Sequence, residues 1–199
     1  MTRWIEPVTL KGECVTLEPL AVEHAEALAS AAADGELWKL WYTSIPKPEG
    51  AAAYVATALE WRDKIESMPF VVRRASDNAV VGCTRYFNVD VINRRLEIGY
   101  TWYAKSVQKT ALNTEAKLLL LSHAFDVLHC IAVEFRTHWM NHASRTAIAR
   151  LGAKQDGVLR HHAIGPDGTL RDTVVFSVIA PEWPTVRRHL LFKLGRLSC

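Results

Sequence analysis

A six-residue polar loop is the stretch of this sequence whose residue types best suit ligand binding. It reads Gln108-Lys109-Thr110-Ala111-Leu112-Asn113 and lies between an apolar-aromatic run and a helical pattern. Thr110 or Asn113 can cap the helix that follows. Free N–H groups at a helix start, with the positive end of the helix dipole behind them, hold phosphates without a special side chain. The pattern therefore predicts an anion site, although a similar spacing also occurs in plain α/β scaffolding.

Two elements must position this loop. The run Leu96–Tyr103 has the composition of a strand. After the loop, apolar residues recur at helical spacing close to one face, namely Ala116, Leu119, Leu120, Ala124, Phe125 and Leu128. The run Ile131–Thr137 then alternates like a half-buried strand, which a helical crossover places parallel to Leu96–Tyr103.

The segments before and after this centre predict further elements. The expected strands are Glu13–Leu17, Phe70–Arg73, Val80–Tyr86 and a closing hairpin within residues 156–178. The expected helices are Ala21–Ala33, Glu49–Ser67, a short one that ends at Leu151-Gly152-Ala153, and a last one after Trp183. Pro69 is expected to mark the end of the second helix.

Composition limits the class of protein. A chain of 199 residues with 49% hydrophobic and 23% charged residues predicts one soluble globular domain over residues 1–199. The four cysteines are isolated, so the spacing indicates neither a zinc site nor a disulfide framework. Neither a signal-peptide run nor a membrane-spanning stretch is found, and the expected location is the cytoplasm. A net charge of +3 is too mild to predict a nucleic-acid partner, and no membrane partner is expected.

Several ordered pieces resemble one family. The strand end Ile98-Gly99-Tyr100, the polar loop and the following helix look like the coenzyme A site of the GNAT superfamily of N-acyltransferases, with Ala111 and Asn113 where loop glycines are usual. Asn141-x-x-Ser144, followed by an Ala/Ile-rich helix, is similar to the segment that flanks the pantetheine arm. The closing hairpin resembles the RimJ/RimL branch, which acetylates ribosomal-protein N-termini and related amines. The resemblance covers roughly residues 9–185.

This resemblance implies an α+β fold and an acetyl-CoA site. The fold is a mixed, mostly antiparallel sheet of about seven strands, with helices on both faces and a split between two central parallel strands. The pantetheine amides would pair with backbone groups exposed by the split, almost like an extra strand. The implied acetyl-CoA contacts are Tyr100, Thr101, Trp102, Gln108, Lys109, Thr110, Ala111, Leu112, Asn113, Asn141 and Ser144.

Amine acetylation requires a neutral amine and a proton for the departing thiolate. Glu97, on the central strand, is the candidate base, directly or through a water. It could equally serve only as an ion-pair partner of Arg94, Arg95 or Arg136. Lys105 stands where the RimL-like pattern can carry another acidic residue, which leaves the use of a base open.

Ser144 is the candidate proton donor to the thiolate, because many superfamily members have a tyrosine near this place and this chain has none. Its hydroxyl can donate a hydrogen bond to the leaving sulfur. Asn141 could hold the pantetheine or orient the serine, or it could simply cap the helix. This chemistry requires no metal.

The aromatic loop that contains Trp38, Trp41 and Tyr42 is the candidate acceptor site, and His161 and His162 could also shape it. Trp38, Trp41, Tyr42 and Trp61 could instead be hydrophobic cover for the sheet. The favoured function is an acetyl-CoA-dependent N-acetyltransferase that acts on a protein N-terminal or small-molecule primary amine. The alternative is a non-catalytic module that binds coenzyme A or another ligand. The sequence leaves open the identity of the acceptor and the oligomeric state, a homodimer included.

Overall fold

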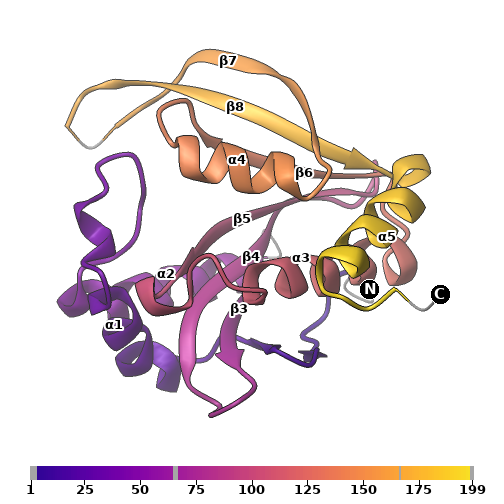
Figure 1. Cartoon of the computed structure of the whole chain (residues 1–199). Helices are drawn as coiled ribbons and strands as arrows, with labels where there is room; N and C mark the ends of the chain where they lie inside the picture. The colour runs from indigo at the N-terminus through magenta and orange to yellow at the C-terminus, as the bar shows by residue number, and fades with distance from the viewer. Residues whose placement is uncertain (1–3, 65–66, 166, 198–199) are drawn as a thin grey trace.

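An eight-stranded mixed sheet forms the centre of the computed structural model, which describes residues 4–64, 67–165 and 167–197 (Figure 1). The strand order is β1-β2-β3-β4-β5-β6-β8-β7. The β5–β6 pair is parallel, and the other pairs of described strands are antiparallel. This architecture confirms the predicted mixed, mostly antiparallel sheet. The additional strand is β1, which pairs with β2 through two residues.

The strands follow the predicted order along the chain. Their bounds are β1 Leu10–Lys11, β2 Val15–Pro19, β3 Ser67–Arg74, β4 Val80–Asp90, β5 Arg95–Tyr103, β6 Ala132–His138, β7 Lys154–Ile164 and β8 Leu170–Ile179. The β3–β4 connection is the predicted hairpin, in which Asn78 adopts a left-handed φ of 59°. Asp77 stabilises this turn by accepting a hydrogen bond from the Ala79 N–H at 3.2 Å.

The prediction that the second helix extends to Ser67 is wrong. Helix α2 spans Ala51–Asp63, and both Ser67 and Pro69 lie in β3. The carbonyl oxygen of Pro69 accepts a hydrogen bond from the Leu20 N–H at 2.9 Å, just beyond the last residue of β2. The nitrogen of Pro69 therefore faces the edge where β2 has ended, so a strand can hold this proline without losing a ladder hydrogen bond.

Helices cover both faces of the sheet, as predicted. Besides α2 they are α1 Ala25–Ala33, α3 Leu112–Ser122, α4 His142–Arg150 and α5 Trp183–Lys193. Two residues of β4 whose side chains point to opposite faces of the sheet show which helices cover each face. The Cys83 sulfur lies 3.2 Å from the Tyr54 hydroxyl of α2, whereas the Tyr86 hydroxyl donates to the Leu120 carbonyl of α3 at 2.7 Å. In Figure 1, α1 and α2 lie together at the left, and α3 and α5 lie together at the right.

The predicted split lies between β5 and β6. Their parallel register covers only Arg95–Glu97 opposite Ala132–Glu134, although both strands continue beyond it. A β-bulge changes the β4–β5 register between Cys83 and Arg85, and Tyr100 has a φ of 49° there. A bulge bends its strand and increases the local twist. The bend accounts for the separation of β5 from β6 beyond Glu97.

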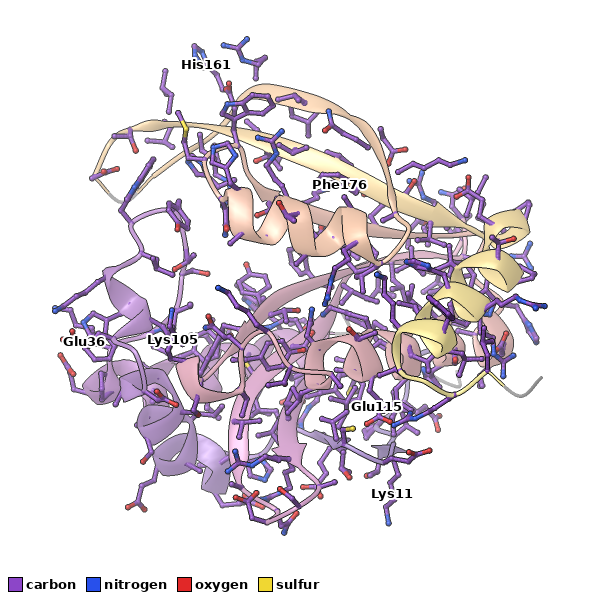
Figure 2. The ribbon with its side chains drawn as sticks, viewed as in Figure 1. Lys11, Glu36, Lys105, Glu115, His161 and Phe176 are labelled. Carbon is purple, nitrogen blue, oxygen red and sulfur yellow. The ribbon has the colours of Figure 1, made fainter. Side chains whose placement is uncertain are left out.

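A buried carboxylate in α3 joins the two ends of the described chain. Glu115 accepts hydrogen bonds from the backbone N–H groups of Glu13 at 2.9 Å, Cys14 at 2.5 Å and Val15 at 2.9 Å, and it also pairs with Arg196 (Figure 2). Burial alone raises the pKa of Glu115. The donated hydrogen bonds and the Arg196 guanidinium outweigh that effect and hold the pKa below its ordinary value.

Glu115→Gln should lower the free energy of unfolding at neutral pH by on the order of 2–4 kcal/mol, because the half-buried Arg196 guanidinium and three N–H donors lose a buried, ionised acceptor. The pKa of Glu115 is lowered in the folded state. Its contribution is therefore complete above 4.5, the ordinary value, and disappears as the pH falls further. Urea unfolding at neutral and acidic pH measures both effects.

Glu60→Gln is the matched control, because Glu60 makes an exposed ion pair with Lys64 at 2.7 Å. Loss of such a pair changes stability by less than about 1 kcal/mol. Equal urea midpoints for Glu115→Gln and Glu60→Gln would contradict the structural role of Glu115.

Candidate active site

The polar loop leads directly into α3, as predicted, but Asn113 is not its cap. The helix begins at Leu112, and Asn113 is its second residue. The Thr110 hydroxyl accepts a hydrogen bond from the Leu112 N–H at 3.3 Å and donates one to the Val107 carbonyl at 2.7 Å. The Gln108 side chain donates to the carbonyl of Tyr103 at 2.9 Å, which ties the loop to the end of β5.

Backbone donors accumulate at this helix start. Within the part of the chain that the structure describes, the N–H groups of Lys109, Ala111, Asn113 and Thr114 have no hydrogen-bond partner. Lys109 adopts a left-handed φ of 62°, which turns the loop into the helix. Such a set of free donors at the positive end of a helix dipole is suited to an anion.

Two cationic side chains lie on this loop and on the neighbouring helix. Lys109 is exposed. Arg150, in the last turn of α4, donates a hydrogen bond to the Thr114 hydroxyl at 3.3 Å and so brings a guanidinium to the start of α3. Arg150 was not predicted as a site residue, because only the tertiary structure brings the end of α4 to the start of α3. Lys105 contacts a different element, since its backbone N–H donates to the Asp34 carbonyl at 3.0 Å (Figure 2).

Glu97 is the last residue of β5 that pairs with β6, so it lies where the split begins, and it is 5% exposed. It accepts a hydrogen bond from the Asn88 side chain at 2.9 Å. Of the three arginines weighed as its ion partners, Arg136 comes within 3.6 Å, whereas Arg95 pairs with Glu134 instead. Glu97 also lines a cavity of about 180 Å³, together with Asn88, Asp90, Arg95, Leu96, Glu134 and Arg136.

Burial raises the pKa of Glu97 to about 7, against the opposing effects of Arg136 and Asn88. A carboxyl group with this pKa is partly ionised at neutral pH and can accept a proton. Gly99 gives it space, because a Cβ at that position would lie 3.2 Å from the Glu97 Oε1. The environment of Glu97 is thus compatible with a general base as well as with an ion pair.

In the turn from β6 into α4, Asn141 has the capping role that was one of its two predicted alternatives. The Asn141 side-chain oxygen accepts a hydrogen bond from the Ser144 N–H at 3.0 Å, so Asn141 is the N-cap of α4. Ser144 is half-buried, and its hydroxyl has no hydrogen-bond partner among the described residues. The hydroxyl is therefore free to donate to a ligand.

The four aromatic residues weighed as one cluster separate in the structure. Trp41 and Tyr42 lie beside His138, at the end of β6, with ring centroids 5.0 and 6.3 Å from the imidazole. Trp61 instead stacks on Phe87 at 6.1 Å. Trp38 is half-buried and makes no ring contact within the described residues.

The two hairpin histidines lie on β7, the outer strand of the sheet. The exposed His161 donates its backbone N–H to the Asp172 carboxylate at 2.8 Å, and Figure 2 shows it on the outer side of the hairpin. The His162 ring lies 3.1 Å from the Thr173 hydroxyl. These contacts bind the histidines to the hairpin itself and bring neither of them to Glu97.

Two buried cations were missed by the sequence analysis. Arg85 of β4 is 2% exposed, and its guanidinium carbon lies over the rings of Tyr54, Trp61 and Tyr100 at 5.2, 5.5 and 4.1 Å. Among the described residues it has no carboxylate partner. An arginine within the apolar run Val80–Tyr86 was the available signal, because charged residues are rarely buried without a reason.

The second buried cation is Lys117 of α3, on the opposite face of the sheet. Its ammonium group donates to the hydroxyls of Thr101 at 2.8 Å and Thr84 at 3.4 Å. Burial lowers the pKa of Lys117 to about 7. The lysine is therefore partly neutral near physiological pH.

Two further features are absent from the part of the chain that the structure describes. No three or more histidine, cysteine, aspartate or glutamate side chains among the described residues form a set that could hold a metal ion. No helix in the described part of the chain combines the length and the apolar character that crossing a bilayer requires.

Comparison with known proteins gives one consistent family. The acetyltransferase (GNAT) domain matches residues 15–154. A Bacillus subtilis (strain 168) protein named "Putative ribosomal N-acetyltransferase YdaF" is 28% identical over 175 residues, which cover 86% of this chain and 94% of the relative. A crystal structure described as a "putative acetyltransferase" from T. thermophilus has a TM-score of 0.84 and 33% identity, covering 96% of this chain and 99% of that one. Mycobacterium smegmatis RimJ, solved with CoA-disulfide, shares the fold at a TM-score of 0.79 and 24% identity, with 96% of each chain covered.

The Glu97 carboxyl should titrate with a pKa near 7, and Arg136→Gln should raise that pKa further by removing the cation that favours the carboxylate. Carbon-13 NMR of labelled glutamate carboxyls measures both values, and the signal lost in Glu97→Gln identifies the residue. Arg74→Gln, on the exposed hairpin, should leave the titration unchanged. A midpoint at the ordinary value of 4.5 would contradict the burial argument.

Proposed function

The chain belongs to the GNAT acetyltransferase family, and on that premise we propose that it transfers an acetyl group from acetyl-CoA to a primary amine. The amine attacks the thioester carbonyl directly in a ternary complex, so that the C–N bond forms as the C–S bond breaks. The observation that carries this proposal is the position of Glu97, buried where the parallel strands separate. A base at that point is adjacent to the opening into which a thioester would extend.

The free donors at the start of α3 support an acetyl-CoA site. The pyrophosphate would accept hydrogen bonds from the N–H groups of Lys109, Ala111, Asn113 and Thr114, and the Arg150 guanidinium would add positive charge. Ala111 is exposed, so its methyl group does not fill the loop from within. The remaining contacts that we propose within the loop are Gln108, Thr110 and Leu112.

The pantetheine arm would lie in the split. Beyond Glu97, the edge of β5 that faces β6 has no strand partner, so those backbone groups of Tyr100, Thr101 and Trp102 that point away from β4 are available to its amides. On the other side of the split, Asn141 and Ser144 begin α4. The CoA-disulfide of the RimJ structure supports coenzyme A as a ligand of this fold.

Glu97 and Ser144 would move the protons. Glu97 takes the proton of the acceptor ammonium, because its pKa of about 7 leaves a substantial ionised fraction at neutral pH. The free Ser144 hydroxyl donates a hydrogen bond to the departing sulfur. The Arg136 guanidinium lies 3.6 Å from the Glu97 carboxylate and stabilises its ionised form.

The acceptor amine would be a protein N-terminus or a small molecule. The Bacillus subtilis relative is named as a ribosomal N-acetyltransferase, which favours a protein N-terminus as the acceptor and a cytoplasmic location. Trp41 and Tyr42 would contact the acceptor from the loop beside His138, and Trp38 would complete that loop. A module that binds coenzyme A without turnover is the alternative, and thiol release over an amine panel distinguishes the two.

Ala111→Asp should weaken acetyl-CoA binding by more than ~1 kcal/mol, because a carboxylate would lie against the phosphates. Isothermal titration calorimetry measures the dissociation constant. Ala56→Asp, which adds the same charge to the exposed side of α2, is the control and should bind as the wild type does. An unchanged affinity in Ala111→Asp would count against the α3 site.

Glu97→Gln and Ser144→Ala should impair turnover with different pH dependence. Glu97→Gln should remove the decrease in kcat/KM that the wild type shows below the Glu97 pKa of about 7. Ser144→Ala should lower kcat on the order of tenfold to a thousandfold across the pH range, with little change in acetyl-CoA affinity. Thiol release measured from pH 5 to 9 gives both profiles. Profiles that superimpose on the wild type would remove both residues from the mechanism.

A further inference from the structure

Arg85 is buried on the face of the sheet that α2 covers, and no carboxylate among the described residues neutralises it. Arg85 lines a cavity of about 350 Å³. The other residues that line it are Ser44, Ala53, Tyr54, Thr57, Trp61 and Tyr100. None of them carries a carboxylate, so this cavity has a single fixed charge, and that charge is positive. Its volume lies within the range of small-molecule sites.

The contacts of Arg85 satisfy only part of its binding capacity. Three aromatic rings face the guanidinium, and their cation–π attraction offsets some of the cost of burial. Yet Arg85 Nε is buried without a hydrogen-bond partner among the described residues. An arginine has five N–H donors in a planar fork, a geometry that matches the two oxygens of a carboxylate. A carboxylate ligand would supply both the missing acceptors and the missing negative charge.

Arg85 is also close to the proposed base. Its cross-strand partner is Gly99, and a Cβ on Gly99 would lie 3.2 Å from Glu97 Oε1. Arg85 and Glu97 are therefore diagonal neighbours on adjacent strands, a relation that separates residues by roughly 7–8 Å. They do not form an ion pair with each other. An acceptor whose amine lies at Glu97 can reach Arg85 with a group only a few bonds away.

We propose that this cavity is part of the acceptor site and that Arg85 makes the site selective for amines that carry a carboxylate within a few bonds of the amino group. The inference rests on the acetyl transfer proposed above and adds the class of acceptor to it. Arg85 binds the carboxylate through its N–H donors, while Tyr54, Trp61 and Tyr100 hold the guanidinium in place. Free amino acids and peptides with an acidic first residue share this chemistry.

Matched pairs of acceptors distinguish free amino acids from peptides with an acidic first residue, and they test the selectivity for a carboxylate. Aspartyl-alanine amide is compared with asparaginyl-alanine amide for the peptide source, and glycine with glycinamide for the free amino acid. Thiol release gives kcat/KM for each, corrected for the neutral fraction of the amine. We expect the wild type to favour the carboxylate member of at least one pair by tenfold or more. The pair that shows the preference identifies the source.

Arg85→Met and Arg85→Lys test whether this residue causes the preference. Arg85→Met removes the charge but keeps an unbranched apolar chain inside the aromatic rings, and it should abolish the preference mainly through KM. Arg85→Lys retains a positive charge without the planar set of N–H donors, and it should keep part of the preference for the carboxylate acceptor. Arg74→Met, at an exposed ion pair of the β3–β4 hairpin, is the matched control and should keep the wild-type preference.

Succinate provides a test on the wild type alone, should the Arg85 variants fail to fold. It has carboxylates but no amine, so it should inhibit competitively against the acceptor, whereas succinamide should not. Equal kcat/KM for both members of each pair, equal inhibition by succinate and succinamide, or a preference that survives in folded Arg85→Met would each overturn the selectivity and leave acetyl transfer intact. A lack of thiol release with every amine would overturn the proposed function itself.

Discussion

The early end of pairing between β5 and β6 is the constraint on which the rest of this structure depends. After three residue pairs, the bulge at Tyr100 turns β5 away, and the two strands present unpaired edges to each other. The helices that follow these parallel strands, α3 and α4, both begin at the same open end. Their positive dipole ends and free N–H groups therefore face one region, as in other sheets that bind ligands beyond the carboxyl ends of parallel strands.

The buried charged groups near this opening have fewer of their hydrogen-bonding and ionic partners than the buried Glu115 has. Glu115 is fully hydrogen-bonded and ion-paired, so its burial stabilises the connection between α3 and the first strands. Glu97 and Arg85 are also buried. The pKa of Glu97 remains raised, and Arg85 Nε has no hydrogen-bond partner among the described residues. Buried groups that remain incompletely satisfied destabilise a fold, and they are typical of sites that complete their contacts with a ligand.

The sequence predicted the order of elements well, because each depends on local signals. Alternating apolar residues, the Asp77-Asn78 turn and the polar loop before α3 gave the sheet, the hairpin and the helix start in their observed places. The helical crossover gave the parallel β5–β6 pair. Pro69 was misread because a proline after a helical pattern normally ends a helix, whereas here it lies at a strand position that needs no N–H donor.

The side-chain environment of the candidate site could not be predicted in the same way. Glu97 was identified from the sequence. Its candidate partners lie before β5, in β5 and in β6, and only the packing of the strands shows that Arg136 is the one that approaches it. Arg150 reaches the start of α3 only through a contact between elements distant in sequence, so no local pattern indicated it. Arg85 stood out locally as a charge within an apolar strand, but the aromatic rings around it come partly from α2. Trp61 was grouped with the aromatic loop by residue type. It lies against Phe87 of β4, as the interpretation of hydrophobic cover for the sheet predicted.

The buried ammonium of Lys117 has a consequence for how this fold responds to alkali. Burial lowers its pKa from 10.5 to about 7, so between these values the unfolded chain binds a proton that the folded chain has released. Unfolding then takes up a proton, and the contribution of Lys117 to stability increases as the pH rises through this range. The interior beneath α3 is therefore a proton-release site coupled to folding, and mild alkali strengthens this part of the protein.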